Sequence, residues 1–72
     1  MSNIASIKVP TINEAIEYAR HDVVSDAEFA VLHSPEHYEG KYNQICKNNN
    51  VPEEVRLAYL KGIDLGFDEA LS

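Results

Sequence analysis

Two histidines and one cysteine are the side chains of this chain best suited to bind a metal. His33 and His37 are four residues apart, and Cys46 lies further along; imidazole and thiolate are common zinc ligands. Ser34 precedes Pro35, and the residue before a proline is disfavoured in the α conformation, so a helix is interrupted between the two histidines. Ser34 instead caps a new helix that begins at Pro35. The spacing therefore does not place both imidazoles on one helical face, no fourth ligand stands out, and we predict no metal site.

Cys46 is also the one candidate nucleophile. A nucleophilic thiol needs a neighbouring base, but Cys46 falls on an apolar stripe, where a cysteine usually behaves as a small buried hydrophobe. The adjacent acids Glu53 and Glu54, like Asp68 and Glu69, point in different directions around a helix and form no acid/base pair. Motifs for phosphate binding, a serine nucleophile or a metalloprotease are absent from the sequence. We therefore predict that the chain is not an enzyme and uses no cofactor.

The tyrosines are better candidates for a binding surface, because tyrosine is enriched at protein interfaces. Tyr38 and Tyr42 share one face of the helix that begins after the serine–proline pair, with Glu36, His37 and Glu39 close by. We predict partner contact through these five residues. The alternative is that the tyrosines fill the edge of a small core and keep their hydroxyls in water.

The elements that position these side chains are helices. Residues 1–10 lack helical spacing, and apolar and polar residues alternate from Ala5 to Val9, which is typical of an extended segment. Residues 11–72 carry apolar side chains at helical spacing. We therefore predict an all-α fold, a small bundle of about four helices in one domain, with an extended N-terminal arm.

Two capping boxes predict where the first two helices begin. Thr11 with Glu14 opens a helix that ends near Asp22, and Ser25 with Glu28 opens the next one. The second helix is apolar nearly all round and short, because the serine–proline pair ends it. We expect this helix to be the most buried element.

The last predicted helix, residues 53–71, carries the most regular pattern of the chain. Ala58, Gly62, Gly66 and Ala70 recur every four residues and form one stripe. Two glycines inside a helix cost about 2 kcal/mol together, so either the helix breaks at Gly62 or close packing explains them. If the helix is continuous, we predict close helix approach at the two glycines, and the stripe would serve self-association of two copies.

The net charge of the chain limits the class of partner that it can bind. Acidic residues outnumber Lys plus Arg by 12 to 6, for a net charge of −6. Nucleic-acid binding depends on basic side chains, so we predict no direct contact with nucleic acid. The acidity suits a basic protein partner or mimicry of a polyanion, and it also serves solubility.

One cysteine permits no internal disulfide, and no apolar run reaches the roughly 18 residues of a membrane helix. We expect a cytoplasmic protein without membrane contact.

Residues 25–34, SDAEFAVLHS, resemble the central segment of the Hha-type nucleoid modulators, which read S-D-x-E-x-A-V-x-x-S there. Residues 11–55 are similar to that family more loosely. The resemblance implies a helical co-regulator without enzyme activity that binds the dimerisation domain of the nucleoid protein H-NS. The partner-contacting acidic position of the family falls on His37, beside Glu36. The family is basic whereas this chain is acidic, and residues 1–10 stand in place of its first helix.

These patterns together predict a small acidic module that binds a larger protein and modulates or inhibits it, as expected of a bacterial or phage accessory protein. One alternative is a polyanion mimic that blocks a nucleic-acid-binding protein. The other is an Hha-like co-regulator.

Overall fold

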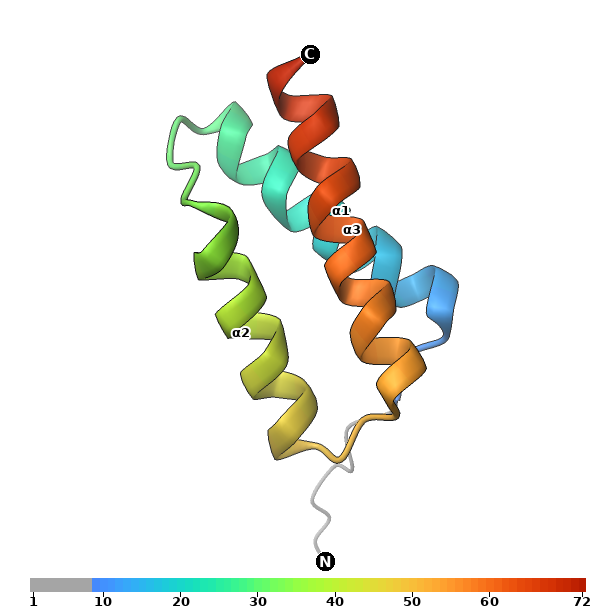
Figure 1. Ribbon diagram of the computed structural model, residues 1–72. Coiled ribbons are helices and arrows are strands. Elements are labelled where there is room, and N and C mark those ends of the chain that lie inside the picture. The colour runs from blue at the N-terminus through green and yellow to red at the C-terminus, as the bar shows by residue number, and fades with distance from the viewer. Residues whose placement is uncertain (1–8) are drawn as a thin grey trace, which may run out of the picture.

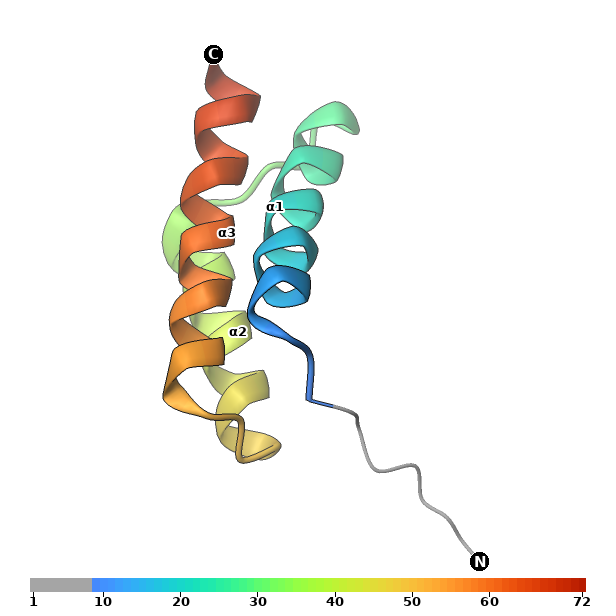
Figure 2. The ribbon, with the colours of Figure 1, turned by 90° about the vertical axis from the view of Figure 1, so that its right-hand side faces the viewer.

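The computed structural model describes residues 9–72, and these residues form three helices (Figure 1). They are α1, Ile12–Glu28, α2, Pro35–Asn48, and α3, Glu53–Leu71. Figures 1 and 2 show α1 and α3 running in the same direction, with α2 running in the opposite direction beside them. The predicted all-α class is confirmed, but the described residues hold three helices and not about four. None of these three helices is long and apolar enough to cross a membrane.

The N-terminal half of α1 begins as predicted, but the helix does not stop at Asp22. The Thr11 hydroxyl accepts a hydrogen bond from the Glu14 N–H at 3.1 Å, and the Glu14 carboxylate accepts one from the Thr11 N–H at 2.9 Å. The second predicted capping box is wrong, because Ser25 lies inside α1. Val23, just before it, is fully buried against α3. Packing of this face outweighs the local capping pattern and keeps the helix continuous.

The end of α1 is a Schellman turn around a left-handed residue. Ala30 has φ 61°, its N–H donates to the Ala27 carbonyl at 3.1 Å, and the Val31 N–H donates to the Asp26 carbonyl at 2.9 Å. The segment predicted to be the most buried helix is therefore mostly a surface loop. Phe29 and Val31 are 75% and 53% exposed.

Ala30→Gly should raise the free energy of unfolding by about 0.5–1 kcal/mol. The left-handed conformation costs an L-residue roughly 1–2 kcal/mol, and the greater freedom of glycine in the unfolded chain offsets part of this gain. Urea unfolding followed by helical circular dichroism measures the change. Ala27→Gly, inside α1, is the control and should lose about 1 kcal/mol. A loss of stability in Ala30→Gly would contradict the assigned turn.

α3 lies directly on α1 at two glycines. A Cβ added to Gly62 would collide with the carbonyl oxygen of Ile16 and lie 2.8 Å from the Cβ of Ala19; one added to Gly66 would lie 2.7 Å from the Cβ of Val23. The helix is continuous through both glycines, so the alternative of a break at Gly62 is wrong. The predicted close helix approach is present, and it occurs between α1 and α3 of one chain.

α2 completes the core from the side with aromatic side chains. Tyr38, Tyr42 and Cys46 are buried. The Tyr38 ring meets Phe67 of α3 edge to face, with centroids 5.8 Å apart, and Tyr42 stacks on Tyr59 at 4.7 Å. The two tyrosines predicted to contact a partner are therefore core residues, and their rings hold α2 on α3.

The ends of α2 follow the sequence signals closely. Pro35 is its first residue, as predicted, although the Ser34 side chain forms no capping hydrogen bond. Asn50, in the asparagine run after α2, has φ 52° and turns the chain towards α3. The predicted extended arm, residues 1–10, lies outside the described residues apart from its last two positions.

Candidate functional site

The fold divides the predicted partner surface into buried and exposed parts. Tyr38 is 0% exposed and Tyr42 is also buried, whereas Glu36, His37 and Glu39 lie on the surface of α2. A partner cannot touch the Tyr38 ring while α2 keeps this position. Contact through the three exposed residues stays a prediction.

The predicted self-association stripe is occupied by α1 of the same chain. Ala58, Gly62 and Gly66 are buried, and Ala70 is partly buried. A second copy can reach the first three positions only if α1 leaves them. In the described fold the stripe positions α3 on α1, and self-association through it is a prediction that requires this displacement.

Two hydroxyls of α2 reach carboxylates of α1. The Tyr42 hydroxyl and the Lys41 Nζ both donate to Oδ2 of Asp22, at 2.8 and 2.7 Å. The Tyr38 hydroxyl donates to Oδ2 of Asp26 at 2.6 Å. These charge-assisted bonds satisfy groups that are partly removed from water. The two aspartates therefore fix α2 against α1 and are not free to bind a ligand.

Asp22 makes this interface sensitive to acid. Burial raises the pKa of Asp22, but the hydrogen bonds from Lys41 and Tyr42 and the nearby charges of Lys41 and His37 outweigh burial and hold the pKa below its usual value. A carboxyl whose folded pKa is depressed stabilises the fold above its unfolded pKa, about 3.9. That stabilisation is lost as the pH falls through the folded pKa.

Asp22→Asn should therefore cost about 1 kcal/mol at pH 7 and flatten the loss of stability below about pH 4. Urea midpoints measured at a series of pH values from neutral to strongly acidic report both effects. Asp64→Asn, which removes an exposed acid of α3, should follow the wild-type pH dependence. An Asp22→Asn variant with the wild-type acid slope would show that another carboxyl controls the transition.

The two histidines are brought together, contrary to the prediction from the sequence. The rings of His33 and His37 stack with centroids 4.0 Å apart and planes 21° apart. The loop before α2 brings His33 over the first turn of α2, where the backbone N–H of His33 donates to the Tyr38 hydroxyl at 3.2 Å. Because the two rings are nearly parallel, their nitrogen lone pairs do not converge on one point, where a single metal ion would have to lie. Within residues 9–72 no group of three metal-binding side chains forms.

Cys46 is a core residue, as the sequence predicts. It is buried on α2, and burial raises the pKa of its thiol even though the charge of Arg56 opposes this effect. A raised pKa leaves little thiolate at neutral pH. The side chain therefore contributes packing.

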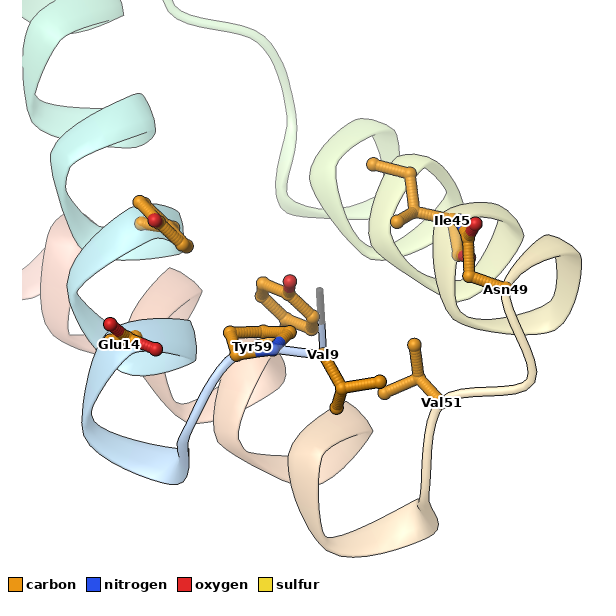
Figure 3. A pocket seen from close by; sticks show the side chains of 8 residues that line it. Val9, Glu14, Ile45, Asn49, Val51 and Tyr59 are labelled. Carbon is orange, nitrogen blue, oxygen red and sulfur yellow. The ribbon is translucent and has the colours of Figure 1, made fainter. Parts of the chain in front are cut away.

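A pocket of about 270 Å³ opens where α1 begins, α2 ends and α3 begins (Figure 3). Figure 3 shows Glu14 on the α1 side, Ile45 and Asn49 on the α2 side, and Tyr59 of α3 between them. The volume is just below the roughly 300–1,000 Å³ of typical small-molecule sites, so it suits a single side chain. Its walls are Val9, Pro10, Glu14, Tyr18, Ile45, Asn49, Val51 and Tyr59.

Apolar and aromatic walls with one carboxylate define the chemistry of this pocket. Among residues 9–72, Glu14 is the only charged side chain of the lining. Its Oε1 accepts the capping bond, and its Oε2 has no partner in this part of the chain. Tyr18 is 57% exposed. Burial raises the pKa of Tyr59, so its hydroxyl stays protonated at neutral pH. The pocket presents hydrogen-bond acceptors, aromatic faces and a negative charge.

Comparison of the chain with protein-family models, curated proteins and solved structures finds no match. The resemblance to the Hha-type modulators stays a prediction. The residues that carry it, 25–34, span the end of α1 and the following loop.

Sequence reasoning missed this pocket because its walls come from segments far apart in the chain. One partial signal was present: Glu14 and Tyr18 are four residues apart, so they share a face of α1. Asn49, Val51 and Tyr59 join them only through the packing of α2 and α3.

Proposed function

We propose that this chain is a small acidic protein-binding module that modulates or inhibits a larger protein without catalysing a reaction. The pocket between the ends of the helices supports this function best. It has the size of one side chain, and its rim carries the exposed ring of Tyr18. Tyrosines that flank a pocket are typical residues of strong binding at protein interfaces.

The neighbouring surface supports the same proposal. Val9 and Tyr18 both line the pocket, and both side chains are exposed. They add apolar surface at the pocket that a partner can cover. By contrast, the carboxylates of Asp22 and Asp26 already bond to α2, so these acids support the fold.

Capture of partners from a cell extract, with identification by mass spectrometry, tests the function. The immobilised full chain is compared with Tyr18→Ala and with Phe29→Ala. Tyr18→Ala should bind the partner about thirtyfold more weakly and recover correspondingly less of it, since interface tyrosines contribute about 2 kcal/mol. Phe29→Ala removes an even more exposed aromatic ring beyond the other end of α1 and should recover the partner normally.

Circular dichroism of each variant confirms that it is folded before capture. Equal recovery by wild type and Tyr18→Ala would overturn the assignment of the pocket as the contact surface. Equal losses in Tyr18→Ala and Phe29→Ala would show general apolar adhesion instead of a defined interface. Conversion of a small molecule by the purified chain would overturn the proposal as a whole.

A further inference from the structure

We propose that the pocket at the helix ends binds the side chain of an arginine supplied by the protein partner. This inference rests on the proposed function and names the chemistry of the contact. An arginine combines an aliphatic stem with a planar cation that stacks on aromatic rings and donates several hydrogen bonds. The pocket presents a matching surface for each of these parts.

The acceptors lie on two walls. Glu14 offers Oε2, which has no partner among the described residues, from the α1 side. Asn49 lies on the α2 side (Figure 3), and its amide Nδ2 donates to the Ile45 carbonyl at 2.9 Å, so its Oδ1 remains as an acceptor. A guanidinium has donors on several sides and can bond to both acceptors.

Aromatic and aliphatic walls suit the rest of the side chain. Tyr18 and Tyr59 offer ring faces, on which a guanidinium is attracted by the π-electrons. Tyr59 is held in place because it stacks on Tyr42 at 4.7 Å. Ile45 and Val51 add apolar contacts for the methylene stem of the ligand.

The charge balance of the chain favours a cationic ligand at this place. Arg20, Lys41 and Arg56 each form an ion pair with a carboxylate of the chain. Among residues 9–72 no basic residue lines the pocket, so this part of the lining does not compensate the charge of Glu14. The net charge of −6 also attracts positive ligands over longer distances.

Nuclear magnetic resonance titration of the full chain with N-acetyl-arginine amide tests the inference. N-acetyl-citrulline amide is the matched probe, because it has nearly the same shape and no charge. At about 150 mM NaCl, where screening acts beyond ~8 Å, arginine should shift the amide signals of Tyr18, Asn49 and Tyr59. Citrulline should bind about fivefold more weakly, since it lacks the charge-assisted bond.

Two variants of equal net charge locate the effect. Glu14→Gln keeps a side chain that supports the capping box, and it should reduce the preference for arginine over citrulline to about one. Glu28→Gln removes an exposed acid at the last residue of α1, away from the pocket lining, and should keep the wild-type preference.

Two results would overturn the inference. The first is equal binding of the two probes, and the second is a shift pattern centred on Asp64 and Asp68 of α3 instead of the pocket. Partner capture that depends on Tyr18 without arginine preference would leave the proposed function intact. Capture that is independent of Tyr18 would remove the pocket as the contact surface, and this inference with it.

Discussion

Replacing Gly62 with alanine should lower the free energy of unfolding by about 2–3 kcal/mol, although alanine is the better helix former. The added methyl group would collide with the carbonyl oxygen of Ile16 and lie 2.8 Å from the Cβ of Ala19. A backbone carbonyl cannot rotate away, so the two helices must move apart and loosen their contact. Overpacking of this kind costs about 1–3 kcal/mol or more. Thermal unfolding should shift down by about 10–20 °C in a domain of this size.

Gly40→Ala is the matched control. A Cβ at Gly40 meets no atom within 4 Å, and the residue is exposed inside α2. Only helix propensity changes there, so this variant should gain up to about 1 kcal/mol. Gly66→Ala should fall between the two, because part of its obstruction is the side chain of Val23. A Gly62→Ala variant as stable as the wild type would refute the close contact of α1 and α3.

The same variant separates two roles of the small-residue stripe. If Ala58, Gly62 and Gly66 pack on α1 of their own chain, Gly62→Ala lowers the stability of the monomer whatever the protein concentration. If they join two copies, the loss depends on protein concentration, because association is coupled to folding. Molar mass by light scattering at two concentrations completes the comparison.

α3 shows which features helical periodicity predicts from the sequence and which it does not. Spacing of four residues placed Ala58, Gly62 and Gly66 on one stripe, and the structure keeps them on one face of a continuous helix. Periodicity gives the face but not the neighbour that covers it. The neighbour is α1, which has Ala15 and Ala19 on its buried face. Small residues on both helices explain the close approach, and only their pairing in three dimensions reveals it.

α1 shows how a local signal is overruled. Ser25 and Glu28 match a capping box, but a serine caps only when its backbone is extended. At Ser25 the alternative is to continue a helix whose last buried residue, Val23, already packs closely against Gly66 of α3. The helix then ends at Glu28, and the left-handed residue after its cap is Ala30. The sequence gives no stop signal there, because glycine is the usual residue at that position.

The tyrosines of α2 could be predicted as important but not as buried. Helical spacing places Tyr38, Tyr42 and Cys46 on one stripe, and the sequence left open whether that stripe faces a partner or the core. The stripe faces the core because two aspartates of α1, Asp22 and Asp26, accept hydrogen bonds from the tyrosine hydroxyls. A tyrosine can be fully buried at low cost only when its hydroxyl is bonded. The acceptors precede the tyrosines by 12 and 20 residues, so no local pattern indicates them.

Tyr38→Ala should therefore destabilise the fold by about 3–5 kcal/mol, close to complete unfolding for a domain of this length. The side chain is fully buried, meets Phe67 edge to face, and bridges Asp26 and the His33 N–H. Its removal leaves a large cavity and an unbonded carboxylate. Urea unfolding followed by circular dichroism measures the loss, and Tyr18→Ala is the control, since an exposed ring should cost less than about 1 kcal/mol.

Tyr38→Phe separates the ring from the hydroxyl. It keeps the packing but leaves Asp26 and the His33 N–H without their partner, so it should cost about 1–2 kcal/mol. A core position therefore predicts that Tyr38→Ala is far less stable than Tyr38→Phe, and that Tyr38→Phe is less stable than the wild type. A surface position predicts the reverse pattern: Tyr38→Ala would remain folded and lose only the partner. Stability and partner capture are therefore measured on wild type, Tyr38→Ala and Tyr38→Phe. The two readouts together decide whether Tyr38 contacts a partner along with Glu36 and Glu39 or only supports the core beneath them.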